Sequence, residues 1–125
     1  MKQDQSYKKE LLTSWEETYK KGQLTFWLLL GLRDKPLYVT EIKEFITSST
    51  NGTISCEEQS IYRSLRKYYD LEIVDYELRQ GYKGPDRKYY FLTSLGKDLL
   101  KDFTKRNISI LYNESLSALI NNTKL

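Results

Sequence analysis

The sequence predicts a mainly α-helical protein with one small β-hairpin. Apolar residues recur at three-to-four-residue spacing over most of the 125-residue chain, while residues 73–93 alternate in the manner of strands. A turn-rich, basic loop interrupts the alternating stretch after Gln80. The length suffices for one hydrophobic core but is too short for two ordinary domains. We therefore expect the hairpin to pack on the helices.

Two helices are predicted in the first third of the chain. Residues 5–21 form an amphipathic pattern whose apolar side carries Leu11, Leu12, Trp15 and Tyr19. Gly22 interrupts this pattern. Residues 23–33 are almost wholly apolar, which predicts a helix at the centre of the fold. Pro36 then enforces a break, because it disfavours helical geometry in the residue before it.

Two more helices are predicted before the hairpin. Residues 38–47 place Val39, Ile42 and Ile46 on one side of a helix, and residues 48–54 are a polar loop. Ser55 and Glu58 then have the spacing of a capping box, in which a hydroxyl and a carboxylate satisfy free amides at a helix start. The fourth helix is therefore expected to begin there and to end near residue 71.

The hairpin and a C-terminal helix complete the pattern. Residues 73–80 alternate, with Val74, Tyr76 and Leu78 on one face, and residues 88–93 have the composition of a second strand. Thr93 can cap a last helix that runs to about residue 121, and either Asn107 or Asn113 is a candidate break in it.

This order of elements is that of a winged helix-turn-helix domain with an added helix at each end. Residues 23–92 alone supply three helices and a hairpin. We therefore predict an N-terminal helix over residues 1–22, a winged-helix domain over residues 23–93, and a C-terminal helix over residues 94–125, whose roles in binding DNA and in dimerisation are argued below.

Composition argues against an enzyme, a metal site, a cofactor or a membrane protein. The chain has no histidine, and its single cysteine, Cys56, allows neither an internal disulfide nor a thiolate cluster. It lacks a Gly-rich phosphate loop. The longest strongly apolar run, residues 26–32, is far shorter than the roughly 20 residues that span a bilayer. The polar N-terminus has no signal-peptide core, so we expect the reducing cytoplasm.

One side of the helix predicted at 55–71 suits DNA. With Ile61 at zero on a helical wheel, Leu65 and Tyr68 fall within about 40° of it. The opposite side carries hydrogen-bonding and cationic groups, which suit base edges in a major groove. We predict that this recognition helix binds DNA through Gln59, Ser60, Arg63, Arg66 and Lys67, of which Gln59, Ser60 and Arg63 read bases. The alternative is an amphipathic helix whose arginines merely face water.

The loop of the hairpin adds a second cationic feature. Residues 79–88 contain four cations and one acid. A basic loop between two strands is suited to phosphates or a minor groove, and phosphate contacts position a protein while carrying little sequence information. We assign Lys83, Arg87 and Lys88 to such contacts. A solvated turn is the alternative.

Three segments resemble the PadR family of bacterial transcription regulators. Residues 28–37, with Leu-Leu-Leu-Gly-Leu and then Lys-Pro-Leu, look like the first winged-helix segment of the family. Residues 60–65, Ser-Ile-Tyr-Arg-Ser-Leu, look like its recognition helix. In that match, Tyr62 falls on a characteristic tyrosine and joins the predicted DNA-binding residues. Residues 84–93, followed by Gly96, look like its wing, second strand and the start of its last helix.

The resemblance spans about residues 24–100 and includes departures. The family usually has proline where this chain has Arg63, glycine where it has Glu72, and a His-Gly pair within the segment 38–40. The chain thus looks like a divergent member. The operator and inducer of its relatives cannot be transferred to it.

The resemblance implies a homodimer whose C-terminal helix packs against the partner, often together with the N-terminal helix. A long apolar stripe after a small domain also needs a cover on physical grounds. The predicted dimerisation residues are Leu99, Phe103, Ile110, Leu111, Leu119 and Ile120. The alternative is a stripe that folds back on its own domain. Two-fold symmetry would place two recognition helices about one DNA turn apart, on a near-palindromic operator.

Some relatives bind aromatic or other planar molecules between the winged-helix and dimer domains. By that resemblance, Trp15 and Trp27 are candidates to line a site for a small aromatic effector. The alternative is that they belong to the core, where aromatic residues at helical spacing usually lie.

The predicted function is sequence-specific binding of double-stranded DNA by a homodimeric transcriptional regulator, a repressor. The alternative is a winged-helix module that binds protein without gripping DNA. Charge placement favours the first, because a protein-binding module has no need of arginines on the side that faces the groove.

Overall fold

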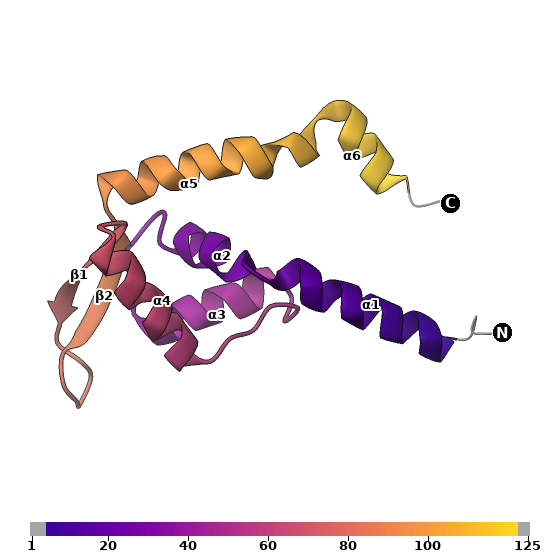
Figure 1. Cartoon of the computed structure of the whole chain (residues 1–125). Helices are drawn as coiled ribbons and strands as arrows, with labels where there is room; N and C mark the ends of the chain where they lie inside the picture. The colour runs from indigo at the N-terminus through magenta and orange to yellow at the C-terminus, as the bar shows by residue number, and fades with distance from the viewer. Residues whose placement is uncertain (1–4, 123–125) are drawn as a thin grey trace.

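The computed structural model describes residues 5–122 as six α-helices, one 3₁₀ helix and a two-stranded hairpin (Figure 1). The elements in chain order are α1 (Gln5–Lys20), α2 (Gln23–Gly31), α3 (Val39–Ser49), α4 (Glu58–Asp70), β1 (Val74–Arg79), β2 (Arg87–Leu92), α5 (Ser94–Asn107), η1 (Ser109–Tyr112) and α6 (Glu114–Asn121). The predicted fold class, mainly α with a small hairpin in winged-helix order, is confirmed. Of the predicted N- and C-terminal units, residues 1–4 and 123–125 lie outside the described residues.

The core lies where α2, α3 and α4 meet the hairpin. Leu28 of α2, Ile42 and Ile46 of α3, and Ile61 and Leu65 of α4 are all 0% exposed. Each fully buried aliphatic side chain contributes about 1.5–3 kcal/mol relative to an exposed one. The apolar segment predicted to lie at the centre is therefore central, and it supports α4 from behind.

The start of α4 differs from the prediction. The helix begins at Glu58, and Ser55 lies in an extended segment before it rather than in a capping box. Ile54 and Cys56 pack against the core from this segment, which keeps Ser55 outside the helix. The carboxylate of Glu58 instead accepts a hydrogen bond from the Thr40 hydroxyl at 3.3 Å. The capping-box prediction is wrong because these core contacts outweigh a local cap.

A tight turn at Glu72 joins α4 to β1. Glu72 has φ of 63°, in the left-handed region that glycine tolerates best. Its N–H donates to the Tyr69 carbonyl at 3.0 Å, and the N–H of Ile73 donates to the Tyr68 carbonyl at 2.8 Å. These two bonds form a Schellman motif, which satisfies carbonyls at the helix end. The turn sets the direction in which the hairpin leaves α4.

The hairpin is antiparallel, and its register runs from Val74 opposite Leu92 to Arg79 opposite Arg87. Val74 and Leu92 are buried in the core, as the alternation predicts. Leu78, predicted on the same face, is 60% exposed. The reason is that the far end of the hairpin projects beyond the helices (Figure 1).

A third segment is paired with the hairpin. Leu37, just before α3, exchanges two backbone hydrogen bonds with Tyr90 of β2, at 3.0 and 2.8 Å. A two-stranded hairpin is marginally stable by itself, so this bridge fixes the wing to the body of the domain. The bridge also brings the start of α3 beside β2.

The start of α5 is built around Thr93 and Gly96. The Thr93 hydroxyl accepts a hydrogen bond from the Gly96 N–H at 3.0 Å, and it lies 2.6 Å from the Glu72 carbonyl oxygen. The predicted cap is confirmed. A Cβ at position 96 would lie 2.1 Å from the Ile73 carbonyl oxygen, so only glycine allows this close approach. These contacts tie α5 to the end of α4.

Both candidate asparagines interrupt the C-terminal helix. The first piece, α5, ends at Asn107, whose side chain donates to the Phe103 carbonyl at 3.1 Å. Asn113 caps α6, because its side-chain oxygen accepts from the N–H groups of Ser115 at 2.9 Å and Leu116 at 3.3 Å. The last helical region, for which one break at either asparagine was predicted, is therefore divided into three pieces, α5, η1 and α6.

The terminal helices project from the domain. Figure 1 shows α1 and the α5–η1–α6 arm extending to the same side of the winged helix. No helix within residues 5–122 is long and apolar enough to cross a membrane.

Candidate nucleic-acid interface

The exposed side of α4 carries the polar groups that the helical wheel predicts. Ile61, Leu65 and Tyr68 are buried against the core. This orientation turns the opposite side outward, and it exposes Gln59, Tyr62, Arg63, Arg66 and Lys67. An α-helix with one face buried and a cationic face in solvent is able to enter a major groove.

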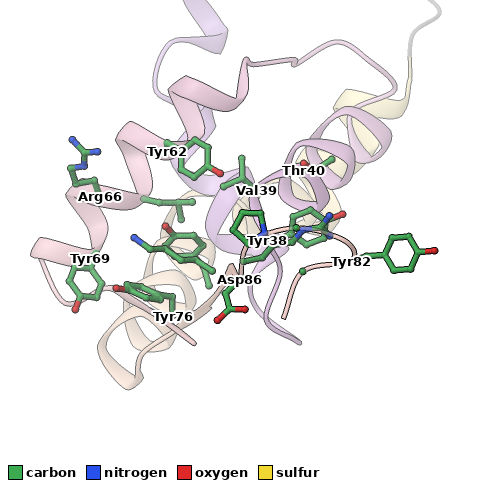
Figure 2. Close-up of a pocket in the computed structure, with 16 residues that line it drawn as sticks. Tyr38, Val39, Thr40, Tyr62, Arg66, Tyr69, Tyr76, Tyr82 and Asp86 are labelled. Carbon is green, nitrogen blue, oxygen red and sulfur yellow. The ribbon is translucent and has the colours of Figure 1, made fainter. Parts of the chain in front are cut away.

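A groove of about 860 Å³ separates α4 from the hairpin (Figure 2). Tyr62 and Arg66 line it from α4, and Arg87 and Lys88 line it from the start of β2. Its charged lining comprises these three cations and Asp86, so the groove is electropositive. The structure thus brings together four of the nine predicted DNA-binding residues.

The groove is also rich in tyrosine. Six tyrosines line it: Tyr38, Tyr62, Tyr69, Tyr76, Tyr82 and Tyr90. Their rings supply flat apolar walls, and their hydroxyls supply hydrogen-bonding groups. Sugars, phosphates and base edges can contact such a lining.

The other predicted DNA-binding residues lie around the groove. Gln59 and Lys67 lie on the exposed face of α4. Ser60 is half-buried, and its hydroxyl accepts a hydrogen bond from Arg63 Nη2 at 3.3 Å. Lys83 lies at the exposed tip of the hairpin with φ of 56°. If these residues contact DNA as predicted, they do so from beside the protein groove rather than from inside it.

Four cations of the hairpin lie over tyrosine rings, one of them Lys83, whose Nζ is 5.4 Å from the ring centre of Tyr82. Arg87 Cζ lies 4.5 Å from the ring centre of Tyr38, and Lys88 Nζ lies 4.7 Å from that of Tyr76. Arg79 Cζ lies 4.3 Å from the ring centre of Tyr89. Cation–π contacts of this kind restrict the side-chain positions. Arg87 and Lys88 are thus held at the groove edge.

Tyr90 forms part of the groove floor. It is 6% exposed, and burial raises the pKa of its hydroxyl above the usual 10.0. Tyr62 and Tyr76 raise that pKa further, while the cation of Arg66 lowers it. The hydroxyl therefore stays protonated near neutral pH and adds no negative charge to the groove.

Sequence reasoning missed the tyrosines of the groove apart from Tyr62. Strand alternation already implied that Tyr76 shares a face with Tyr90, and the sequence has 11 tyrosines. Tyr38 had no such signal, because it reaches the hairpin only through the bridge between Leu37 and Tyr90.

The two tryptophans predicted to line an effector site border one hollow of about 500 Å³. Trp15 of α1 and Trp27 of α2 face it, and Ile54 contributes from the loop between α3 and α4. Trp15 is 73% exposed and so is not a core residue of this chain. Trp27 is half-buried against the core.

The predicted dimerisation residues are all exposed. Their exposed fractions range from 42% at Leu111 to 73% at Leu119. The apolar side of α1 is equally open: Leu11, Leu12, Trp15 and Tyr19 are each more than half exposed. Within residues 5–122, the chain covers this stripe only in part, as where the ring of Phe103 packs 5.8 Å from that of Phe26 of α2.

The described part of the chain offers little for metal or thiol chemistry. Between residues 5 and 122, no group of three or more His, Cys, Asp or Glu side chains could hold a metal ion. Burial raises the pKa of the Cys56 thiol, against the opposing effect of Lys43, which makes the thiol a poor nucleophile at neutral pH.

Comparison with known proteins gives a consistent result. The model of the transcriptional regulator PadR-like family matches residues 28–102. An uncharacterised protein of Lysinibacillus sphaericus is 29% identical over 85 residues, covering 68% of this chain and 78% of the relative. The family match confirms the resemblance drawn from the recognition-helix and wing segments.

Solved structures with the same fold include two PadR-like regulators. The one from Bacteroides fragilis is 24% identical, with a TM-score of 0.64 over 85% of this chain and 98% of its own. The one from Bacillus cereus is 23% identical, with a TM-score of 0.66, and the match covers 83% of this chain and 97% of the Bacillus cereus chain. Bacillus subtilis PadR, solved in complex with operator DNA, is 25% identical, with a TM-score of 0.59. The match covers 64% of this chain and 44% of the Bacillus subtilis chain.

Proposed function

Because the chain belongs to the PadR-like family of transcriptional regulators and so is not an enzyme, we propose that it binds operator DNA with α4 and the hairpin. The observation that carries this proposal is the groove in which Tyr62 and Arg66 face Arg87 and Lys88. The similarity to Bacillus subtilis PadR, solved in complex with operator DNA, supports it. In this arrangement α4 enters the major groove and the hairpin acts as a wing on the backbone.

The proposed contacts divide into two kinds. Gln59, Ser60 and Arg63 lie in the first two turns of α4, the end at which such helices usually meet bases. Tyr62, Arg66 and Lys67 complete the DNA-facing side of α4. The wing cations Lys83, Arg87 and Lys88 contact phosphates, which supply affinity and salt dependence.

Binding of a mixed-sequence duplex, measured by fluorescence anisotropy over a salt series, tests this function. We expect binding at about 50 mM salt that weakens steeply as salt rises. Arg87→Ala should weaken binding to all sequences alike and flatten the slope by roughly 0.9 for each lost contact. Arg33→Ala is the matched control, because Arg33 is exposed just after α2 and lines no part of the groove.

Two outcomes would refute the function. A wild-type protein that binds no duplex at about 50 mM salt would favour the protein-interaction module, since nonspecific binding is strongest at low salt. Equal effects of Arg87→Ala and Arg33→Ala would mean that the wing is not a DNA contact.

We also infer that the functional form is a homodimer. The apolar sides of α1 and the α5–η1–α6 arm are exposed over the described chain, and a second copy is the cover that the family resemblance implies. Two copies related by a two-fold axis would present two α4 helices about 34 Å apart, matching a near-palindromic operator. Bound there, the dimer would act as a repressor, and a reporter gene placed behind a selected operator should lose expression.

Sedimentation at micromolar concentration tests the dimer. The wild-type protein should sediment as a dimer, and Leu119→Lys should shift it toward monomer because it places a charge among apolar side chains. Asn51→Lys adds the same charge to the exposed loop after α3 and should have no effect. A wild-type protein that stays monomeric would contradict the inference.

The hollow between Trp15 and Trp27 is our proposed site for a small planar aromatic effector. Its lining is mostly apolar, with ionic groups only from Glu16 and Lys20. Titration with anilinonaphthalene sulfonate should quench tryptophan fluorescence, and Trp15→Leu should weaken that binding at least several-fold. Unchanged binding by the variant would place the probe elsewhere.

A further inference from the structure

A row of rings and guanidinium groups crosses the outer face of the wing. Arg79 rests on Tyr89, Tyr89 contacts Tyr38 with ring centres 5.4 Å apart, and Tyr38 carries Arg87. The strand register places Arg79 opposite Arg87 and Glu77 opposite Tyr89, so these side chains share one face of the hairpin. Tyr38 joins the row from outside the hairpin.

The backbone fixes Tyr38 to the body of the domain. Its neighbour Leu37 exchanges two hydrogen bonds with Tyr90, and the Tyr38 N–H donates to Glu41 Oε1 at 3.2 Å. Tyr38 immediately precedes α3, whose buried residues belong to the core. The ring under Arg87 therefore moves with the domain that carries α4 rather than with the wing tip.

The two arginines of the row differ in their ion pairing. Arg79 Nε donates to Glu77 Oε1 at 2.8 Å, so its charge is already compensated. Arg87 forms no ion pair with any residue between 5 and 122. Stacking on a ring uses only the flat face of a guanidinium group, whereas the N–H donors of that group point outward in its plane. Arg87 thus keeps its donors available at the edge of the groove, in a fixed orientation.

We propose that Tyr38 is a positioning residue for DNA binding, which holds the Arg87 guanidinium where it meets a backbone phosphate. This inference rests on the proposed function and adds a residue to it. A cation–π contact at an exposed site corresponds to roughly a two- to five-fold change in an equilibrium constant. A loss of that size is expected in duplex affinity when the ring is removed.

A double-mutant cycle on a mixed-sequence duplex at fixed low salt tests the proposal. Tyr38→Phe keeps the ring and should bind like wild type. Tyr38→Leu should weaken binding about two- to five-fold. In an Arg87→Ala background, Tyr38→Leu should have no further effect, because the group that it positions is gone. Arg33→Ala is the control, because Arg33 is exposed, lies in neither terminal arm and lines no part of the groove.

A second pair of variants keeps the test valid if Tyr38→Leu does not fold. Arg87→Lys preserves the charge but loses the planar stack, so it should weaken binding about two- to five-fold. Arg79→Lys should leave affinity unchanged, since Arg79 is paired with Glu77.

The outcomes separate this proposal from the proposed function. A wild-type protein that binds no duplex would sink both. If wild type binds and Arg87→Ala weakens it, three results would overturn the role of Tyr38 alone: no effect of Tyr38→Leu, an equal loss with Tyr38→Phe, or a further loss in the Arg87→Ala background. The last two would mean that Tyr38 touches DNA itself.

Discussion

Replacing Glu72 by glycine should stabilise the protein. Glu72 adopts φ of 63° at the end of α4, a conformation that costs an L-residue about 1–2 kcal/mol. Glycine removes that cost but adds about 0.4–1 kcal/mol of conformational freedom to the unfolded chain. The Schellman hydrogen bonds use only backbone atoms, so they survive the substitution. The net gain should be about 0.5–1 kcal/mol in the free energy of unfolding.

Urea unfolding at fixed protein concentration, followed by circular dichroism, measures this gain. The midpoint should rise with an unchanged slope. Glu44→Gly, inside the exposed side of α3, is the control and should lose about 1 kcal/mol. DNA affinity should not change, because Glu72 lies outside the groove. A loss of stability in Glu72→Gly would refute the left-handed turn as the junction between α4 and the wing.

Three further predictions concern the wing, the last helix and pH. Gly81→Ala should weaken DNA binding more than it lowers stability, because its Cβ would lie 2.2 Å from the Pro85 carbonyl oxygen, whereas Gly84→Ala, with its nearest atom at 3.9 Å, should be silent. Thr93→Ala should lower the free energy of unfolding by about 1–2 kcal/mol in chemical denaturation. Thr93→Ser keeps a capping hydroxyl and should retain most of the wild-type stability. The pKa of Tyr90 is raised in the folded state, so its stabilisation is complete below pH 10.0 and is lost as pH rises through the folded pKa. Between pH 10.0 and the folded pKa, Tyr90→Phe should therefore lose stability less steeply than wild type in parallel melts, and identical slopes would contradict this.

Periodicity and turn chemistry predicted most of the fold. The apolar side of α4 and the alternation of β1 follow from local spacing, which is why Ile61, Leu65 and Val74 are buried as expected. Thr93 was predictable because its hydroxyl acts on an amide only three residues away. Such features depend on neighbours in sequence, so the sequence alone reveals them.

Tertiary contacts account for what the sequence did not predict. Ser55 has the local pattern of a cap, but its neighbours Ile54 and Cys56 are drawn to the core and delay the helix. Tyr38 lies 49 residues before Arg87 in the chain and reaches it only through a backbone bridge. The cations of the groove were predicted from their charge, whereas the rings that hold them depend on the packing of separate elements.

The salt dependence of duplex binding, measured with the combined Arg66→Ala and Lys88→Ala variant, tests the central claim most directly. These residues come from opposite walls of the groove, one on α4 and one on the wing. The wild-type protein should bind at about 50 mM salt, and the double variant should bind more weakly, with a slope that is flatter by roughly 1.8 for each bound chain if each residue contacts one phosphate. A slope equal to that of wild type would contradict the claim that α4 and the wing grip DNA together.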